Sequence, residues 1–330
     1  MQKHSVPVID IAPLLAQSAQ QTEVAHAIRK ACQTHGFFYI SGHGVSEQLQ
    51  QELEEVSAQF FDLEEAAKQK ISMEKGGRAW RGYFPLGGEL TSGKPDLKAG
   101  LYLGSELGPD DPRVQAGRPM HGANLFPAEI PEFRRIVLSY MDALTNLGHD
   151  LMRGIAMSLG LDEGYFQARY TADPLTLFRI FYYPSSEEVE DQWGVGEHTD
   201  YGVLTILKQD SVGGLQIKSS DKWIDAPYVP GTFVCNIGDM LDRMTGGLYR
   251  STPHRVLNTS GKDRYSFPFF FDPNVDAEIA AIELPDIVLP EDDQHQRWDG
   301  ASVHQFSGTY GDYILTKVGK VFPDLKKGIQ

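Results

Sequence analysis

The chain of 330 residues contains few cysteines and no long apolar run, and each shortage excludes a class of protein. Only Cys32 and Cys235 are present, each in an apolar segment, so we expect two buried thiols in a reducing cytoplasm and no disulfide. No stretch approaches the roughly 18 apolar residues that a membrane span requires. The N-terminus leads directly into a strand-like segment, without the apolar region of a signal peptide. These absences predict a cytoplasmic protein with no membrane partner.

Basic residues are also scarce. The 30 Lys and Arg residues face 45 Asp and Glu residues, which gives a formal net charge of −15. No basic patch offsets this charge, so a nucleic-acid partner is excluded. The hydrophobic fraction of 41% is enough for a sizeable core. We divide the chain into a mixed, largely helical region, 1–130, and a region 131–330. Whether the chain is a monomer or a homodimer stays open.

Hydrophobic periodicity outlines the first region. It predicts a strand over Val6–Ile11, a helix over Thr22–Thr34 with Thr22 as its cap, a buried strand over Phe37–Ile40 and a helix over Ser46–Ile71. Residues 76–104 are rich in glycine and aromatic residues and show no regular period. A loop of this length is often functional, so we place it at the mouth of a site. Tyr102 and Arg81 are its candidate substrate contacts.

The second region begins with the longest helical pattern of the chain, over Pro131–Gly160. After Asp173 the pattern changes to short segments rich in β-branched and aromatic residues, separated by turns. Many short strands of this kind are typical of a jelly roll. The predicted fold is therefore mainly β with α: a double-stranded β-helix core, a helical N-terminal region and a long bracing helix. A final helical segment, Thr309–Val321, is expected to pack over the barrel opening.

Two histidines and one aspartate have the spacing of a metal site. His198 and Asp200 are two residues apart, so on a strand they point to the same side. His254 supplies a second imidazole far downstream. Two imidazoles and a carboxylate on one face of an ion form the facial triad of non-haem Fe(II) oxygenases. We predict that these three residues are the metal ligands and the catalytic centre.

Beyond His254, an arginine and a serine are again two residues apart in the sequence. Arg264 and Ser266 lie on one face of the last predicted strand, and together they suit a carboxylate ligand. Alternation places Phe270 on that face as well, where it would form an apolar wall for the substrate.

In these residues the sequence resembles the iron(II)- and 2-oxoglutarate-dependent dioxygenases of the isopenicillin N synthase-like family. The resemblance runs over nearly the whole chain, and its core lies in five short motifs: Phe178–Pro184, His198–Tyr201, Val212–Gln216, Asn236–Asp239 and Arg264–Ser266. It implies an oxidoreductase that binds Fe(II) through the triad and uses 2-oxoglutarate and O2. Such an enzyme hydroxylates, desaturates or cyclises a small organic substrate and forms succinate and CO2.

The resemblance also implies roles around the triad. It assigns the far carboxylate of 2-oxoglutarate to Arg264 and Ser266, with a hydroxyl contact from Tyr183. One departure is visible, because plant members commonly have Asn where this chain has Phe181. The missing amide is expected to alter how the metal-bound end of 2-oxoglutarate is held.

Two other functions stay open at the level of sequence. One is an Fe(II) oxidase like isopenicillin N synthase itself, which keeps the triad and does not use 2-oxoglutarate. Phe181 and the Tyr-Gly-Asp-Tyr run at residues 310–313 favour it. The other is a non-catalytic small-molecule binder on the same fold, since a sequence does not demonstrate turnover.

Overall fold

Two β-sheets form the centre of the molecule. The computed structural model describes residues 6–91, 94–185, 193–219, 222–284, 300 and 302–321. The larger sheet has eight strands in the order β1-β2-β12-β9-β14-β7-β6-β3, and the smaller has four in the order β11-β10-β13-β8. The larger sheet comprises β1 (Val8–Asp10), β2 (Phe37–Ser41), β3 (Gly82–Phe84), β6 (Ala99–Gly104), β7 (Leu175–Tyr183), β9 (Leu204–Gln209), β12 (Phe233–Ile237) and β14 (Arg264–Asp272). The smaller comprises β8 (Val195–His198), β10 (Leu215–Ser219), β11 (Lys222–Asp225) and β13 (His254–Val256).

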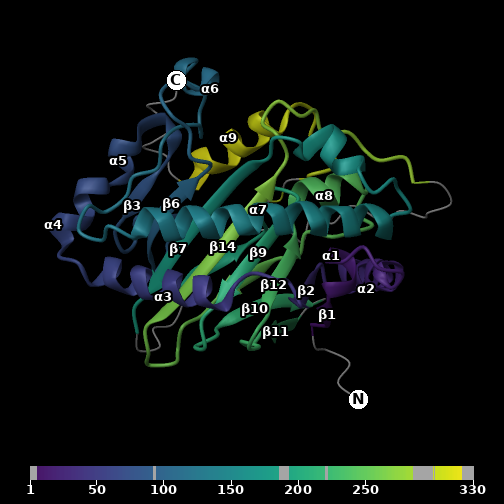
Figure 1. The fold of residues 1–330 in the computed structure, drawn as a ribbon, viewed down its shortest axis with the longest axis horizontal. Coiled ribbons are helices and arrows are strands. Elements are labelled where there is room, and N and C mark those ends of the chain that lie inside the picture. Colours follow the sequence, from purple (N-terminus) through teal and green to yellow (C-terminus); the bar gives the residue numbers. More distant parts are fainter. Residues whose placement is uncertain are drawn as a thin grey trace.

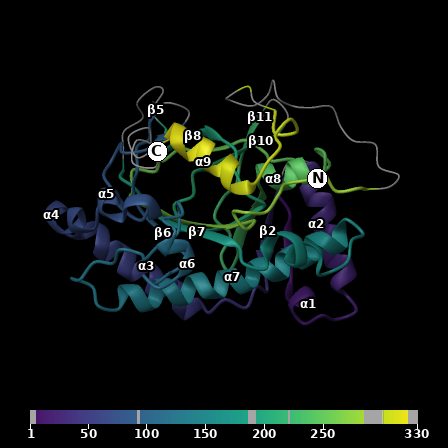
Figure 2. The same ribbon diagram turned by 90° about the horizontal axis from the view of Figure 1, so that it is seen from above.

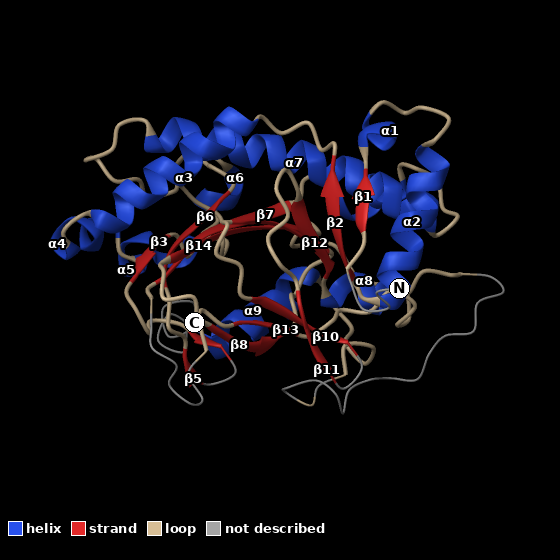
Figure 3. Ribbon diagram, turned by 90° about the horizontal axis from the view of Figure 1, so that it is seen from below, coloured by secondary structure: helices blue, strands red, loops and turns tan. Residues whose placement is uncertain are grey.

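The central strands of the larger sheet are buried on both faces. In β7 every residue except Tyr182 is buried, which explains why the strand reads as a nearly continuous apolar run. Strand β14 pairs antiparallel with β7 on one side and with β9 on the other. One face of these strands packs on helices, and the opposite face looks toward the smaller sheet (Figure 3).

Three helices cover the outer face of the larger sheet. The longest, α7 (Phe133–Ser158), crosses the strands, with α2 (Gln21–Thr34) and α3 (Glu47–Asp62) packed along it (Figure 1). At Gly148 a Cβ atom would lie 2.4 Å from the ring of Phe271 on β14, so the glycine allows the helix its close approach. Helix α9 (Tyr310–Val321) lies on the other side of the molecule (Figure 2). In the described part of the chain no helix is both long and apolar enough to cross a membrane.

The predicted architecture is confirmed. The two-sheet core, the helical N-terminal region and the bracing helix are all present, in the arrangement expected of a jelly-roll oxygenase fold. The expected C-terminal helix is α9. The remaining helices are short: α1 (Ala12–Leu15), α4 (Glu65–Lys68), α5 (Met73–Gly76), α6 (Pro112–Gln115) and α8 (Asp239–Met244).

Two helix predictions in the N-terminal region are wrong. Helix α2 begins at Gln21, and its N-cap residue is Gln20, so Thr22 lies inside the first turn and does not cap it. The helix expected over Ser46–Ile71 stops at Asp62, because Leu63 is extended with ψ of 150° and continues into the short α4. The Ser46 hydroxyl caps its start by accepting from the Leu49 amide.

The stretch 76–104, predicted to be irregular, supplies two strands of the larger sheet. Strands β3 and β6 extend the sheet beyond β7, and β4 (Leu90–Thr91) and β5 (Lys94–Pro95) form a small hairpin. The glycines that obscured β6 have a packing role. A Cβ at Gly100 would lie 2.5 Å from the Phe84 ring, and one at Gly104 would lie 2.1 Å from Arg81 Nη2. Glycine within a strand marks such close approaches.

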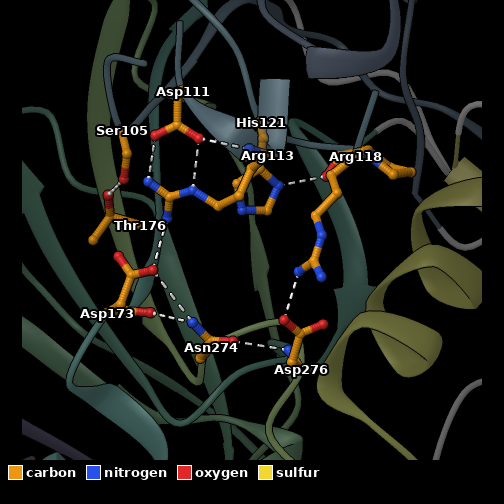
Figure 4. Close-up of polar contacts among 10 residues, drawn as sticks. Ser105, Asp111, Arg113, Arg118, His121, Asp173, Thr176, Asn274 and Asp276 are labelled. Atoms are coloured by element: carbon orange, nitrogen blue, oxygen red, sulfur yellow. Dashed lines mark hydrogen bonds and ion pairs between the residues drawn. The ribbon is translucent and has the colours of Figure 1, made fainter. Parts of the chain in front are cut away.

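Ion pairs tie the connection between β6 and α7 to the ends of β7 and β14 (Figure 4). Arg113 pairs with Asp111 at 2.8 Å and with Asp173 at 2.7 Å. Asn274, just beyond β14, donates to the Asp173 carbonyl at 3.0 Å. The pairs are partly exposed, so each contributes little stability. Their effect is to hold this connection against the sheet.

Candidate metal and co-substrate site

The triad residues meet where the two sheets face each other. His198 ends β8 and His254 begins β13, and these two residues are direct partners across the antiparallel pair. Asp200 follows two residues after His198. One ligand atom from each of the three lies within 4.8 Å of the others, as a single metal ion requires. The predicted grouping of two imidazoles and one carboxylate is therefore present.

The two oxygens of Asp200 have different surroundings. Its Oδ2 accepts hydrogen bonds from the Thr205 hydroxyl at 2.6 Å and from Asn236 Nδ2 at 2.7 Å. Its Oδ1 lies 3.8 Å from His198 Nε2 and 3.7 Å from His254 Nε2. One oxygen is thus held by the protein and the other faces the imidazoles. Such outer hydrogen bonds orient a metal ligand.

The imidazoles are held in a ligating orientation. His198 Nδ1 contacts the Gly196 carbonyl at 2.8 Å, and His254 Nδ1 contacts the Thr252 carbonyl at 3.2 Å. A carbonyl accepts only from a protonated ring nitrogen, so Nε2 keeps its lone pair in the neutral ring. Burial and the neighbouring His198 lower the pKa of His254. It is therefore neutral at physiological pH, as metal binding requires.

Burial acts to raise the pKa of Asp200, but the histidines and the hydrogen bonds from Asn236 and Thr205 outweigh it. The resulting pKa lies below the ordinary value for an aspartate. The carboxylate is thus ionised at neutral pH. Two imidazoles that present Nε2, beside an ionised carboxylate, are the donor set that fits Fe(II).

A cavity opens beside the triad between the two sheets. Helix α9 contributes Ile314 and Val318 to its wall, as expected of a helix that covers the opening. The other lining residues come from both sheets and the segments between them: Phe37, Glu89, Thr91, Lys98, Tyr102, Leu177, Arg179, Phe181, Tyr183, Val195, His198, Thr199, Asp200, Tyr201, Thr205, Leu207, Leu215, Asn236, His254, Val256, Arg264, Ser266, Pro268, Phe270 and Asp272.

Arg264 offers the cavity two unused donors. It is completely buried, and its Nε donates to the Gly213 carbonyl. Nη1 and Nη2 have no hydrogen-bond partner among the described residues. The guanidinium lies 4.6 Å from the centre of the Tyr183 ring, and the Ser266 hydroxyl donates to the Tyr183 oxygen at 3.3 Å. A buried guanidinium with two free Nη atoms fits a carboxylate.

The candidate substrate residues divide into two groups. Tyr102 and Phe270 line the cavity. Arg81 does not, because its side chain lies under the wall, against Gly104 of β6, with an exposure of 1%. The prediction that Arg81 contacts the cavity directly is therefore not met. Its glycine-rich surroundings suggested a loop, whereas they form a strand that buries the side chain.

Several cavity groups escaped sequence reasoning. Thr205 was not singled out, and Asn236 appeared only within a motif, because their contacts with Asp200 depend on the register of neighbouring strands. Lys98, which ion-pairs with Glu89 at 2.8 Å, lies in the stretch taken to be irregular. Arg179 was detectable, because it alternates with Phe181 and Tyr183 on one face of β7.

Comparison with known proteins agrees with this geometry. Residues 6–129 match the family described as the non-haem dioxygenase in morphine synthesis N-terminal region, and residues 174–273 match the 2OG-Fe(II) oxygenase superfamily. The chain belongs to the 2-oxoglutarate- and Fe(II)-dependent oxygenases. It is an oxidoreductase of that family, and its cofactors are Fe(II) and 2-oxoglutarate.

Relatives of this oxygenase are similar over almost their full length. A probable iron/ascorbate oxidoreductase of Dictyostelium discoideum is 52% identical, over 98% of this chain and 96% of that protein. A 1-aminocyclopropane-1-carboxylate oxidase of the same organism is 40% identical, over 97% and 95%. The crystal structure of a full-length Neurospora crassa protein in complex with alpha-KG, which is 2-oxoglutarate, and thymine has a TM-score of 0.80 at 29% identity. That match covers 97% of this chain and 98% of the other.

The tyrosine run that favoured an oxidase has a structural role here. Tyr310 donates to Asp272 Oδ2 at 2.5 Å, and Tyr313 donates to Asp239 Oδ2 at 2.6 Å. Both bonds attach α9 to the body of the oxygenase. Phe181, which replaces the plant asparagine, lines the cavity, and Lys98 Nζ lies 4.8 Å from the centre of its ring.

Proposed function

We propose that His198, Asp200 and His254 bind the Fe(II) of this oxygenase and that Arg264, Ser266 and Tyr183 hold the distal carboxylate of 2-oxoglutarate. The single observation that carries the proposal is the buried Arg264, whose Nη1 and Nη2 lack partners among the described residues and share a cavity with the triad. Leaving such a cation without an anion is costly, so a carboxylate ligand accounts for it.

When bound, the iron supplies the oxidising chemistry with O2 and 2-oxoglutarate, giving succinate and CO2. The protein residues bind, orient and exclude water. Thr205 and Asn236 keep Oδ1 of Asp200 directed toward the imidazoles. Arg264 and Tyr183 fix the far end of the co-substrate. Ile314 and Val318 of α9 close the cavity with apolar surface, which limits the access of water.

The primary substrate is a small molecule held between the iron and the remaining cavity wall, with Tyr102 and Phe270 among its contacts. Hydroxylation, desaturation and ring closure are all compatible with the site. The names of the relatives supply first candidates, 1-aminocyclopropane-1-carboxylate and thymine. We also propose a cytoplasmic location, since Cys32 and Cys235 are both buried and free.

The test measures iron content and succinate formation in alanine variants. His198→Ala and His254→Ala each remove one ligand, so iron content falls sharply and succinate formation from 2-oxoglutarate is lost. His26→Ala, a histidine exposed on α2, is the matched control and keeps both. Full activity in both ligand variants would remove the assignment of the metal site.

A further inference from the structure

The cavity contains a second buried guanidinium, that of Arg179. It lies on β7, four residues before Tyr183 and on the same face, with an exposure of 7%. At about 3.3 Å per residue, its main chain lies about 13 Å along the strand from that of Tyr183, which belongs to the site proposed for 2-oxoglutarate. Two cationic side chains therefore face one cavity at well separated positions.

The contacts of Arg179 are with carbonyls and an aromatic ring. Its Nη1 donates to the main-chain carbonyls of Leu103 and Phe178, each at 3.1 Å. Its Cζ lies 3.5 Å from the centre of the Tyr102 ring, so the planar group is stacked on the aromatic side chain. Among the described residues no carboxylate forms an ion pair with it. A cation buried in this way is costly unless an anion joins it.

A second arginine, Arg81, is buried close to Arg179. Arg81 lies against Gly104, where the absence of a Cβ makes room for its guanidinium. Its Nη2 donates to the Met120 carbonyl at 2.8 Å, and within the described chain Nε and Nη1 are buried without a partner. Burial, followed by the positive charge of Arg179, lowers the pKa of Arg81 to about 9. The two guanidiniums thus lie close enough to repel each other.

The acidic groups of the cavity wall are already engaged. Lys98 pairs with Glu89 at 2.8 Å and with Asp96 at 2.6 Å, and the Tyr102 hydroxyl also donates to Glu89. Asp272 accepts from the Tyr310 hydroxyl at 2.5 Å. Glu89 and Asp272 attract Arg179 electrostatically, but within the described chain neither carboxylate forms an ion pair with it, so its guanidinium has only carbonyls and an aromatic ring as direct contacts.

We propose that Arg179, backed by Arg81, binds a carboxylate of the primary substrate, so that the substrates of this enzyme are small carboxylic acids, amino acids included. The inference rests on the proposed function, in which Arg264 is occupied by 2-oxoglutarate. Leu177 and Phe270 line the wall near Arg179, and the Phe270 ring centre is 5.8 Å from its Cζ. They provide an apolar surface for the carbon skeleton next to the carboxylate. Arg81 acts through its charge and is a positioning residue.

The test measures binding to the anaerobic enzyme loaded with Fe(II) and 2-oxoglutarate by calorimetry. The probes are 1-aminocyclopropane-1-carboxylate, the standard amino acids, and straight-chain and aromatic monocarboxylic acids, each paired with its primary amide, together with thymine. At least one acid is expected to bind, and its amide to bind more weakly by about tenfold or more, because the amide lacks the charge that Arg179 requires.

Variants locate the effect. Arg179→Met lowers the affinity for that acid by about a hundredfold or more. Arg179→Lys keeps the charge without the planar guanidinium, and its affinity for the acid falls by about tenfold. If the Met variant is unfolded, the Lys variant, provided that it folds cooperatively, tests the role of Arg179. The affinity for 2-oxoglutarate, read from its charge-transfer absorption on Fe(II), stays that of the wild type in both. Arg135→Met, an exposed arginine on α7, is the matched control and binds the acid normally.

Three results overturn the inference: no acid of the panel binds, an acid and its amide bind equally, or thymine binds with an affinity that Arg179→Met leaves unchanged. Failure of wild-type protein to develop the 2-oxoglutarate absorption contradicts the proposed function instead, so the two failures are distinguishable.

Discussion

At the scale of single residues, the proposed site uses side chains that bond to the protein through some polar atoms and leave the others available to a ligand. Asp200 gives one oxygen to Thr205 and Asn236 and turns the other toward the histidines. The Nε of Arg264 donates to a main-chain carbonyl, and its two Nη atoms have no hydrogen-bond partner among the described residues. The sequence predicted that these residues would lie at one site, because same-face spacing is visible in a motif. It did not predict the hydrogen bonds that orient these side chains, because those bonds depend on the pairing of distant strands.

Arg264→Leu is expected to weaken 2-oxoglutarate binding and to spare iron. The variant leaves the carboxylate of the co-substrate without its cation in a buried site, a loss on the order of 3–5 kcal/mol. That corresponds to a fall in affinity of roughly a hundredfold to ten-thousandfold. Ser266→Ala removes one hydrogen bond to a charged group and costs about 1.5–3 kcal/mol. The 2-oxoglutarate dependence of succinate formation at saturating iron measures both. An unchanged dependence in Arg264→Leu, with lost affinity for the primary substrate, would show that Arg264 binds the primary substrate and does not hold 2-oxoglutarate.

Asp272 is expected to make stability depend on pH. Burial is the main cause that raises its pKa from 3.8 to about 7. Between these values the folded protein binds the proton that the unfolded chain releases, so this stabilising contribution is complete below about pH 4 and is lost as pH rises through about 7. The slope approaches about 1.4 kcal/mol per pH unit for one proton.

Asp272→Asn should remove that slope. The measurement is the free energy of unfolding by urea in metal-free protein between about pH 5 and pH 7. Asp142→Asn, at an exposed position of α7, is the control and keeps the slope of the wild type. Identical slopes in Asp272→Asn and wild type would show that this carboxyl titrates normally.

At the scale of elements, α9 connects the C-terminal part of the described chain to the site. Ile314 and Val318 line the cavity, while hydrogen bonds from Tyr310 and Tyr313 attach the helix to Asp272 and Asp239. Its helical period was readable from the sequence, and so was its position over the opening. Strand β3 was not predicted, because an element of three residues carries too few periods to be recognised.

Tyr313→Phe is expected to loosen α9. The change removes a buried hydroxyl that donates to a carboxylate and costs about 1–3 kcal/mol. The loss should appear as faster hydrogen exchange of the α9 amides, while the amides of α2 exchange as in the wild type. Equal exchange of α9 in the variant and wild type would mean that other contacts hold the helix.

At the scale of the whole molecule, the fold brings two buried arginines, Arg179 and Arg264, and the group of two histidines and one aspartate to a single cavity. Composition and periodicity were sufficient to predict a two-sheet core braced by a long helix, because α7 and β7 are long and strongly patterned. The resemblance of short motifs to a known family supplied the cofactors. The sequence did not reveal the arrangement of charge in the cavity. Arg179, Lys98 and Glu89 come together only through the pairing of β6 with β7 and the hairpin beside it.

The most direct measurement is an anaerobic titration of the Fe(II)-loaded protein with 2-oxoglutarate, followed by visible absorption. In the wild type a metal-to-ligand charge-transfer band should grow and saturate at one 2-oxoglutarate per chain. The band should be absent in His198→Ala and His254→Ala, and in Arg264→Leu it should require at least about a hundredfold more 2-oxoglutarate. A wild-type protein that binds iron and never develops the band, or a band of full intensity in both histidine variants, would contradict the account.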